Sequence, residues 1–291
     1  MSRIVTSYPN PDTDGVACII AVASYYGFAP VIQGRLSAET DFVLKKVGLE
    51  APQQFDKFEY SEEIILVDTH HLAQIGKDFP SNKVVRIIDH HPGGDTSAFI
   101  NAKIDNRAIG AAASIVGEMY LQSKEIRPSI CKLLQYAIAS NTLLFTAPAT
   151  SLFDKDIFHI LNERHHVSEK ELNEMMDKRT GEDITSDIKY FDFTGGRIAI
   201  AQLEKRELDF SVEEVKIILD RIDKQDNLLF SIFNGVNISK KESTVVFSSG
   251  INDVQAMKIF PFRIQNGISR VDRILLRKTD FVPAIVGFQE K

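Results

Sequence analysis

The sequence predicts an α/β protein with two domains: an N-terminal domain built on a parallel sheet, and a smaller α+β domain with a mixed sheet. In the first half, short apolar segments alternate with helical patterns, which is typical of parallel strands whose faces are covered. The length of 291 residues agrees with two domains. A polar stretch, TGEDITSD, separates the halves, so we place the domains at residues 1–180 and 189–291, with a linker at 181–188.

The strands predicted in the first domain are short apolar runs that stop at polar or turn residues: Arg3–Ser7, Ala29–Gln33, Glu63–Val67 and Lys83–Ile88. The first helix is expected at Val16–Tyr26, where small and apolar residues on every side indicate a buried helix. The other helical patterns of this domain are Thr40–Val47, Ala108–Ser123, Pro128–Ser140, Leu152–Glu163 and Ser168–Arg179.

The second domain has more predicted strands than helices. Its strands are expected at Lys189–Phe193, Arg197–Gln202, Leu229–Val236, Ser243–Ser248 and Phe281–Phe288. One helix is predicted at Ser211–Gln225, because Ser211 and Glu214 have the spacing of an N-cap residue and its capping partner. This pattern favours a mixed sheet with few helices.

Composition and charge exclude several classes of protein. The chain has 40 acidic and 34 basic residues, a net charge of −6, which argues against a general nucleic-acid or anionic-membrane binder. The longest apolar runs, such as Ile64–Val67 and Val282–Val286, are far shorter than the roughly 20 residues of a membrane span. The N-terminus has no apolar signal core, and Cys18 and Cys131 form no CxxC pattern. We therefore expect a cytoplasmic protein with no membrane and no stable nucleic-acid partner.

Acidic and histidine residues follow three of the predicted strands. Asp12 and Asp14 follow the first strand, Asp68 follows the third, and Asp89-His90-His91 follows the fourth. In open α/β sheets, ligands bind beyond the carboxyl ends of the strands. Carboxylates gathered there repel one another unless a cation neutralises them, and carboxylates with imidazoles suit Mn²⁺, Fe²⁺, Co²⁺ or Zn²⁺. The pattern favours a metal centre, although a turn and helix cap is the alternative for Asp12 and Asp14.

The order of these motifs resembles a known family. Asn10-Pro11-Asp12-Thr13-Asp14, Asp68 and Asp89-His90-His91 resemble the motifs of the DHH phosphoesterases. Asp187–Phe191 resembles the DxKxF segment of one branch, the family II (manganese-dependent) inorganic pyrophosphatases, and Leu276–Lys278 with Val282-Pro283 resembles its C-terminal motif. The resemblance spans nearly the whole chain, and it implies a DHH domain followed by a DHH-associated domain.

The resemblance implies a metal set in the first domain. Asp12, Asp14, Asp68 and His90 match metal ligands, with Asp68 bridging two ions, and Asp89 matches a residue that orients a ligand histidine. The metal implied is Mn²⁺, with Co²⁺ or Mg²⁺ as alternatives. The reaction implied is hydrolysis of inorganic pyrophosphate, or a related phosphoanhydride, by metal-activated water.

The resemblance also implies residues that hold the substrate, a small phosphate compound. His91 matches a residue that contacts substrate and protonates the leaving group, and Lys189, Arg277 and Lys278 match cations that bind phosphate. From the residues alone, Arg277-Lys278 would be interpreted as a solvated surface pair. The family further suggests a homodimer.

Two positions depart from the family pattern. Tyr8 stands where the family has a histidine ligand, and Asn141 stands where it has an aspartate ligand. Tyrosine binds a metal only if its pKa falls far below about 10, and asparagine offers only a neutral carbonyl oxygen. Both remain candidate ligands, but weaker metal binding is expected. His70 or His71 could replace the missing nitrogen, although we favour solvated loop histidines.

Two alternatives to a pyrophosphatase remain open. One is a DHH-type phosphoesterase for polyphosphate, nucleotides or short oligonucleotides, in which Tyr8 could stack on a base. The other is a catalytically impaired protein that binds a phosphate ligand without turnover. A panel of substrates tested with Mn²⁺, Co²⁺ and Mg²⁺ separates the three hypotheses.

Overall fold

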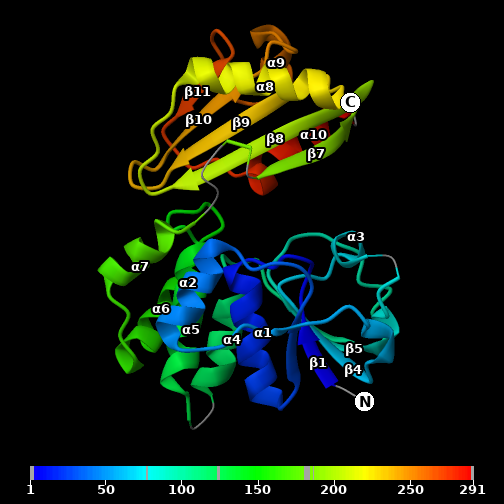
Figure 1. Ribbon diagram of the computed structural model, residues 1–291, viewed down its shortest axis with the longest axis vertical. Helices are drawn as coiled ribbons and strands as arrows, with labels where there is room; N and C mark the ends of the chain where they lie inside the picture. The colour runs from blue at the N-terminus through cyan, green and yellow to red at the C-terminus, as the bar shows by residue number, and fades with distance from the viewer. Residues whose placement is uncertain (1–2, 77, 123–124, 180–183, 186, 290–291) are drawn as a thin grey trace. The chain divides into compact units, whose positions relative to one another are not determined.

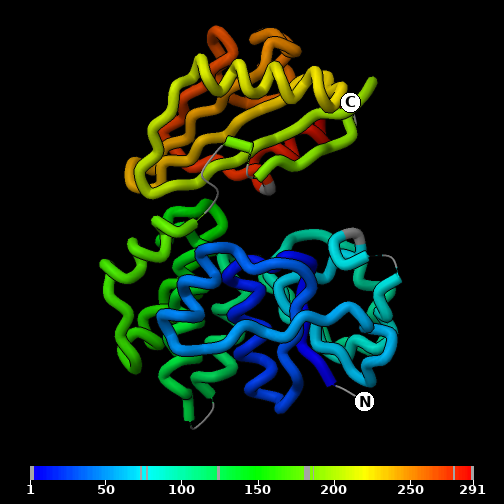
Figure 2. Tube along the Cα trace, in the orientation of Figure 1, coloured from blue at the N-terminus to red at the C-terminus, as the bar shows by residue number. Residues whose placement is uncertain are grey.

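The protein is analysed as a computed structural model, which describes residues 3–76, 78–122, 125–179, 184–185 and 187–289. The chain divides into two compact units, Met1–Lys178 and Arg179–Lys291 (Figures 1 and 2). Much of the predicted linker, at residues 181–183 and 186, lies outside the described residues. The first strand of the second unit begins at Ile188.

Unit 1 contains a six-stranded sheet in which all neighbouring strands are parallel. The strands are β1 (Arg3–Thr6), β2 (Ala29–Ile32), β3 (Gln53–Gln54), β4 (Glu63–Val67), β5 (Val84–Asp89) and β6 (Lys103–Asn106). Their order is β3-β2-β1-β4-β5-β6, so the chain moves outward from β1 and then returns to its other side. This reversal creates a topological switch point between β1 and β4, where α/β sheets bind ligands. The predicted fold class is confirmed.

Helices cover one face of this sheet in two layers. They are α1 (Thr13–Tyr26), α2 (Ala38–Val47), α4 (Ala112–Leu121), α5 (Pro128–Asn141), α6 (Leu152–Arg164) and α7 (Glu169–Met176). The short helix α3 (Leu72–Ile75) lies on the other face, where Leu72 and Ile75 pack in an aromatic cluster. The helix α1 packs on β1 and β2, α4 packs on β5, and α5 lies against α1, α4 and α6 (Figure 1). Because α1 lies between the sheet and α5, its residues are buried from Thr13 to Ala23, as the sequence predicts. Within the described residues, no helix is long and apolar enough to cross a membrane.

The opposite face of the sheet is covered by an aromatic cluster carried on connecting segments. Alternate strand residues such as Ile4, Ile64 and Leu66 pack against Phe58 and Phe79. The alternation follows from the strand period of two, which points successive side chains to opposite faces. Both faces of the parallel sheet are therefore buried.

Unit 2 is built on a five-stranded mixed sheet in the order β11-β10-β9-β8-β7. The strands are β7 (Ile188–Phe193), β8 (Gly196–Lys205), β9 (Phe230–Asn237), β10 (Glu242–Phe247) and β11 (Ile268–Val271). The pair β8 and β9 is parallel, joined through α8 (Val212–Asp226), and the other pairs are antiparallel. The helix α8 packs on one face of the sheet, and α9 (Asp253–Ile259) and α10 (Val282–Gln289) contribute to the core on the other.

The prediction of a strand at Phe281–Phe288 is wrong. This segment is the helix α10, and a π-helical turn at Arg277–Phe281 precedes it. Phe281 and Ile285, four residues apart, are buried, while Val286 is 46% exposed, which is the pattern of one helix face. A short apolar run does not distinguish a strand from a packed helix, and Pro283 is tolerated in the first turn of a helix.

Candidate metal centre

The carboxyl ends of β4 and β5 bring Asp68 next to the turn Asp89-His90-His91. Asp68 follows β4 directly, and its backbone amide donates a hydrogen bond to Ile88 O on β5 (2.8 Å). Its φ of 57° is left-handed, which is rare for a residue other than glycine and costs about 1–3 kcal/mol unless the surroundings hold it. Such strain collects at functional sites, and here it lies at the predicted strand end.

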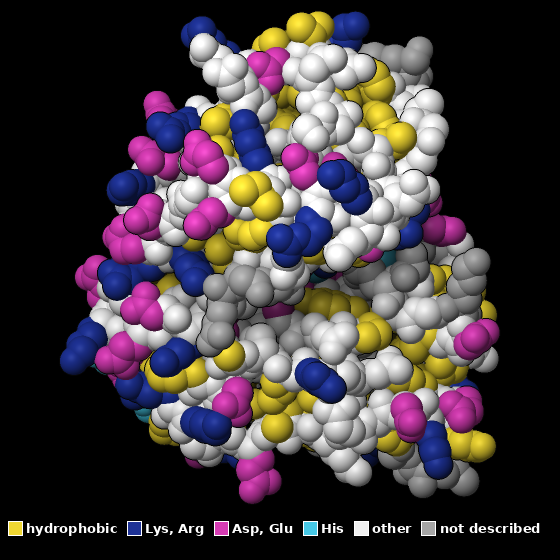
Figure 3. Space-filling model, turned by 45° about the horizontal axis from the view of Figure 1, so that its top comes forward, with side chains coloured by type: hydrophobic (Ala, Val, Ile, Leu, Met, Phe, Trp, Pro, Cys, Tyr) yellow, Lys and Arg dark blue, Asp and Glu magenta, His cyan; other side chains and the backbone are white. Residues whose placement is uncertain are grey.

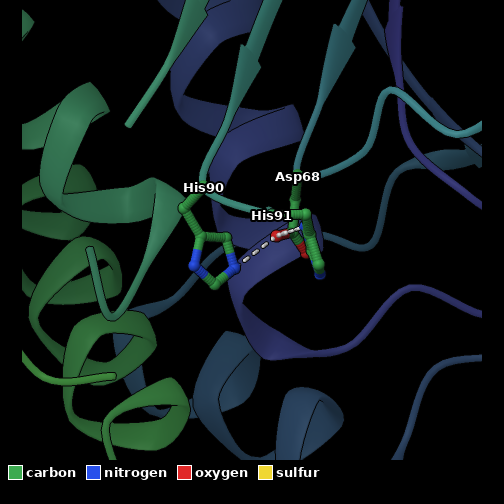
Figure 4. Close-up of side chains that lie close together, drawn as sticks. All are labelled: Asp68, His90 and His91. Carbon is green, nitrogen blue, oxygen red and sulfur yellow. Dashed lines mark ion pairs between the residues drawn. The ribbon is translucent and has the colours of Figure 1, made fainter. Parts of the chain in front are cut away.

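The side chains of Asp68, His90 and His91 converge on one point (Figure 4). His90 Nε2 lies 3.3 Å and His91 Nδ1 lies 3.9 Å from Asp68 Oδ1. One ligand atom from each residue fits within 4.8 Å of the others. Asp68 Oδ1 is buried and accepts no hydrogen bond from any described residue. A buried carboxylate oxygen left unbonded beside two imidazoles fits a divalent cation.

His90 is held in the tautomer that a metal ligand requires. Its Nδ1 lies 2.9 Å from Ile109 O, which can only accept, so the proton is on Nδ1. Nε2 is thus directed to Asp68 and to Asp14, whose Oδ2 is 3.9 Å away. Metal-ligating histidines commonly donate their other ring nitrogen to a backbone carbonyl in this way.

The electrostatics of the site also favour a cation. Burial, followed by the nearby charge of Asp12, raises the pKa of Asp68 to about 7. Burial alone would lower the pKa of His90, but the adjacent carboxylates of Asp68 and Asp14 raise it to about 9. Carboxylates packed this closely resist ionisation until positive charge is supplied. A divalent ion would supply that charge and displace the protons.

Asp89 lies behind the histidines and is fully buried. Its Oδ1 accepts from the backbone amides of His90 (2.7 Å) and His91 (3.2 Å) and lies 2.6 Å from His91 Nδ1. Its Oδ2 pairs with His70 Nδ1. This is the geometry of a residue that orients histidines.

The interpretation of His70 as a solvated histidine is wrong. The side chain is buried, with Nδ1 on Asp89 and Nε2 2.5 Å from Gly93 O. The loop passes so close that a Cβ on Gly94, where φ is 89°, would lie 2.2 Å from His70 Nε2. Both ring nitrogens are occupied, so His70 does not replace a missing ligand in this arrangement. His71 is half-buried beside it, with ring centroids 4.3 Å apart.

Asp12 and Asp14 have different environments at the start of α1. Asp12 is exposed and is the N-cap, its Oδ1 accepting from Gly15 N (3.0 Å). The helix-cap interpretation is therefore correct for Asp12, although the cap uses only one carboxylate oxygen. Asp14 is buried, and its oxygens accept from the backbone amides of Ala112 and Ala113 (2.8 Å each). These amides belong to the first turn of α4, where the helix dipole stabilises an anion.

The two departures from the family pattern both lie at the site. Asn141 ends α5, and its Nδ2 lies 2.8 Å from Gly110 O, 3.2 Å from Asp14 Oδ2 and 3.3 Å from His90 Nε2. Because Gly110 O can only accept, the amide presents donors to the site. The hydroxyl of Tyr8 accepts from Asp12 N (3.3 Å). Burial, with the charges of Asp12 and Asp68, raises the pKa of Tyr8 well above 10, so Tyr8 is a neutral phenol here.

Comparison with known proteins agrees with these motifs. Residues 3–139 match the family model described as the DHH family, N-terminal domain. The matched residues lie within unit 1 and include β1, Asp68 and the Asp89-His90-His91 turn. Across the chain, this protein is 29% identical to the manganese-dependent inorganic pyrophosphatase of Methanocaldococcus jannaschii, covering 97% of this chain and 98% of that protein. The enzyme of the same name from Methanothrix thermoacetophila is 24% identical, with 97% and 96% covered.

Solved structures show the same likeness. The crystal structure of a Methanococcus jannaschii protein assigned to the family II inorganic pyrophosphatases has a TM-score of 0.80 at 28% identity, and the match covers 99% of this chain and 100% of that chain. An exopolyphosphatase-related protein from Bacteroides fragilis shares the fold, with a TM-score of 0.53 at 14% identity over 99% and 92% of the two chains. The resemblance inferred from the motifs is confirmed.

Unit 1 contains a buried carboxylate that the sequence analysis missed. Glu39, in the first turn of α2, accepts from Thr13 Oγ1 (2.7 Å) and from Ser140 Oγ. It therefore joins the start of α1 to the end of α5, next to Asp14 and Asn141. In the sequence, an acidic residue in a first helical turn indicates only a favourable dipole interaction, so no local signal marks this role.

The cations predicted to bind phosphate lie in unit 2. Arg277 is 9% exposed, and its Nη2 pairs with Asp187 Oδ2 (2.7 Å) while its Nη1 donates to Asp187 O (3.0 Å) and Ile200 O (3.2 Å). The solvated-pair interpretation is thus wrong for Arg277. Lys189 is exposed on β7. The side chain of Lys278 lies outside what the structure describes.

Proposed function

We propose that this protein is a metal-dependent phosphohydrolase that cleaves inorganic pyrophosphate or a related phosphoanhydride. The observation that carries the proposal is the unbonded Oδ1 of Asp68, buried between His90 and His91. The similarity to named manganese-dependent pyrophosphatases over 97% of the chain supports this choice of reaction.

Asp12, Asp14, Asp68 and His90 would hold the metal, with Mn²⁺ favoured by the names of the relatives and Co²⁺ or Mg²⁺ as alternatives. When bound, a divalent ion lowers the pKa of a water and neutralises charge on the phosphoryl oxygens. The chain itself supplies orientation: Ile109 O sets the tautomer of His90, and Asp89 fixes the turn that carries both histidines.

His91 is proposed to donate a proton to the departing phosphate. Asp89 Oδ1 occupies Nδ1 of His91, which leaves Nε2 as the nitrogen that can exchange a proton with substrate. Asp89 fixes the ring through Nδ1, so a proton on Nε2 could be given to the leaving group by His91 as general acid.

Lys189, Arg277 and Lys278 are proposed to bind the phosphate groups of the substrate. Three N–H groups of Arg277 are engaged by Asp187 and Ile200. A guanidinium has five such groups, so the two that donate to no described residue can bind a phosphate oxygen while the protein bonds hold the plane fixed.

The test is phosphate release from pyrophosphate, tripolyphosphate, nucleoside mono- and diphosphates and a short oligonucleotide, each with Mn²⁺, Co²⁺ or Mg²⁺. We expect pyrophosphate with Mn²⁺ to be fastest and His91→Gln to be strongly impaired. Faster turnover of a nucleotide or oligonucleotide would replace the substrate assignment, and turnover unaffected by chelator would overturn the metal-dependent mechanism.

A non-catalytic phosphate-binding protein is the second candidate, and the orientation of Asn141 favours it. Its Nδ2 donors face Asp14 and His90, so the carbonyl oxygen reaches a metal only after the amide rotates. This candidate predicts binding of pyrophosphate in calorimetry without phosphate release. A measurable rate that depends on Mn²⁺ would exclude it.

Partner and compartment assignments also belong to the proposal. On the face drawn in Figure 3, basic and acidic side chains are interspersed. With the net charge of −6, this supports the absence of a stable nucleic-acid partner. We propose a cytoplasmic homodimer, to be checked by light scattering and by fractionation.

A further inference from the structure

One short segment of main chain holds several of the proposed site residues at once. This segment, residues 109–113, leads into α4. The carbonyl of Ile109 accepts from His90 Nδ1 (2.9 Å), and the carbonyl of Gly110 accepts from Asn141 Nδ2 (2.8 Å). Two further backbone amides of the segment donate to Asp14 (2.8 Å each). A displacement of this segment would therefore move three site side chains together.

The segment is fixed from behind by Asp154 of α6, a fully buried carboxylate. Asp154 Oδ2 accepts from Gly110 N (2.8 Å), and Oδ1 accepts from Ala111 N (3.2 Å) and Ser114 Oγ (2.6 Å). Asp154 is 44 residues from Gly110 in the sequence, and among the described residues its side chain is bonded to Gly110, Ala111, Ser114 and Ser151, not to Asp14, Asp68 or His90. It acts on them only through the segment.

The same carboxylate also caps its own helix. Ser151, the N-cap of α6, donates to Asp154 Oδ2 from its backbone amide (2.8 Å) and from its hydroxyl (2.7 Å). A second capping box in the chain, Ser168 with Glu171 at the start of α7, has the same two bonds, but its carboxylate is 29% exposed. Capping alone thus does not need burial, the two bonds to the 109–113 segment, or the third bond to Ser114.

The packing around Gly110 shows that this contact is close. A Cβ at Gly110 would lie 2.8 Å from Asp154 Oδ2 and 2.7 Å from Thr142 Cγ2, the side chain next to Asn141. Residue 110 thus lies directly between Asp154 and the end of α5. The carboxylate of Asp154 thus packs against the segment, and the segment packs against the end of α5 at the site.

We propose that Asp154 is a positioning residue of the metal centre, which sets the orientation of His90, Asn141 and Asp14 through the 109–113 segment. The inference rests on the proposed function only in taking these three side chains as parts of that centre. Removing a residue that holds metal ligands in place, without touching the metal itself, commonly lowers metal affinity by about 10- to 100-fold.

The test compares Asp154→Asn with Ser151→Ala. Asparagine keeps the shape but turns an N–H₂ group toward N–H and O–H donors, which breaks bonds to the segment. Ser151→Ala removes a capping hydroxyl of the same helix and leaves the segment bonds in place. Glu171→Gln, in the capping box of α7, is a second control for a weakened helix start.

Two readouts are needed: Mn²⁺ affinity by calorimetry on the folded full chain, and the ¹⁵N chemical shifts of the His90 ring in metal-free protein, recorded above the His90 pKa of about 9, where the ring is neutral. For Asp154→Asn we expect affinity to fall at least about tenfold, and the His90 signals to lose the pure Nδ1–H tautomer. Both controls should keep affinity within about twofold and leave His90 unchanged, even where their unfolding midpoints fall.

Equal affinity and equal His90 signals in Asp154→Asn and Ser151→Ala would overturn the proposal and leave Asp154 as a helix cap. If Asp154→Asn does not fold, Ser114→Ala replaces it. This variant removes the hydrogen bond from Ser114, the residue that follows the segment, to Asp154 and leaves the bonds of Asp154 to Ser151 in place. A His90 signal that is unchanged there would also count against the proposal. If the wild-type chain binds no Mn²⁺, the proposed function fails, but the His90 signals still decide the positioning role.

Discussion

At Asp68, a left-handed backbone and an unbonded buried carboxylate oxygen occur in the same residue. Each is unfavourable: the left-handed backbone costs about 1–3 kcal/mol, and the buried oxygen has ion-pair contacts with His90 and His91 in place of a hydrogen bond. Folding tolerates both because the β4–β5 pairing fixes the chain at this point. A divalent ion would relieve the second cost, so we expect the residue to be more important for binding than for stability.

Asp68→Asn separates these two effects. Asparagine accepts the left-handed conformation readily, so the backbone strain changes little. The loss of one charge and one ligand oxygen should reduce Mn²⁺ affinity by more than about 100-fold and abolish turnover. Calorimetry measures the affinity, and a urea titration should show a free energy of unfolding close to that of the wild type without metal. Unchanged affinity would remove the central role given to Asp68.

Tyr8 and Asn141 allow the opposite experiment. The double variant Tyr8→His with Asn141→Asp restores an imidazole and a carboxylate beside Asp12, Asp14 and His90. An added anionic oxygen and an added nitrogen should tighten Mn²⁺ binding about tenfold or more, because ligand charge and number set affinity. Calorimetry on each single variant and on the double variant gives the comparison. No gain in any of the three would mean that these positions do not reach the ion.

At the scale of elements, the start of β7 and the π-helical turn before α10 are tied together by Arg277 and Asp187. These segments lie 90 positions apart in the sequence, and Arg277 is nearly buried. The ion pair therefore anchors the turn that carries two of the proposed phosphate-binding residues.

Asp187→Ala tests that anchor. The side chain of Asp187 is 38% exposed, so solvent already weakens its ion pair with Arg277. The variant also keeps the two backbone carbonyls that accept from Arg277. We expect the free energy of unfolding to fall by about 1 kcal/mol, measured by urea titration of the full chain. Lys189→Ala, at an exposed position of β7 two residues after Asp187, should leave stability within about 0.5 kcal/mol. A larger loss for Lys189→Ala than for Asp187→Ala would contradict this account.

Prediction at this scale succeeded where an element has one strong local signal. The buried helix α1 and the strands β4 and β5 follow from apolar runs and the residues that end them. It failed at Phe281–Phe288, because an apolar run of that length packs equally well as a strand or as a helix. The neighbouring core, not the run itself, selects the helix.

At the scale of the whole molecule, the metal should couple to stability. A ligand that binds only the folded state adds about 2.7 kcal/mol when its concentration is 100 times its Kd. We expect Mn²⁺ to raise the unfolding temperature of the chain in calorimetry and excess chelator to reverse the shift. The Asp68→Asn protein serves as the control and should show no shift. An identical rise in that variant would mean that Mn²⁺ binds elsewhere.

The sequence alone determined the class of fold, the edge of the sheet where the site lies, and most of the residues proposed to act there. It could do so because parallel strands bring their carboxyl ends to one edge, so Asp68 and His90 are neighbours once β4 and β5 pair. Only the tertiary structure decided which groups hold those residues: His70 behind Asp89, Asp154 behind Gly110, and Asp187 beside Arg277. These pairs are separated by 19, 44 and 90 residues. The packing of whole elements selects them, and no local periodicity records that packing.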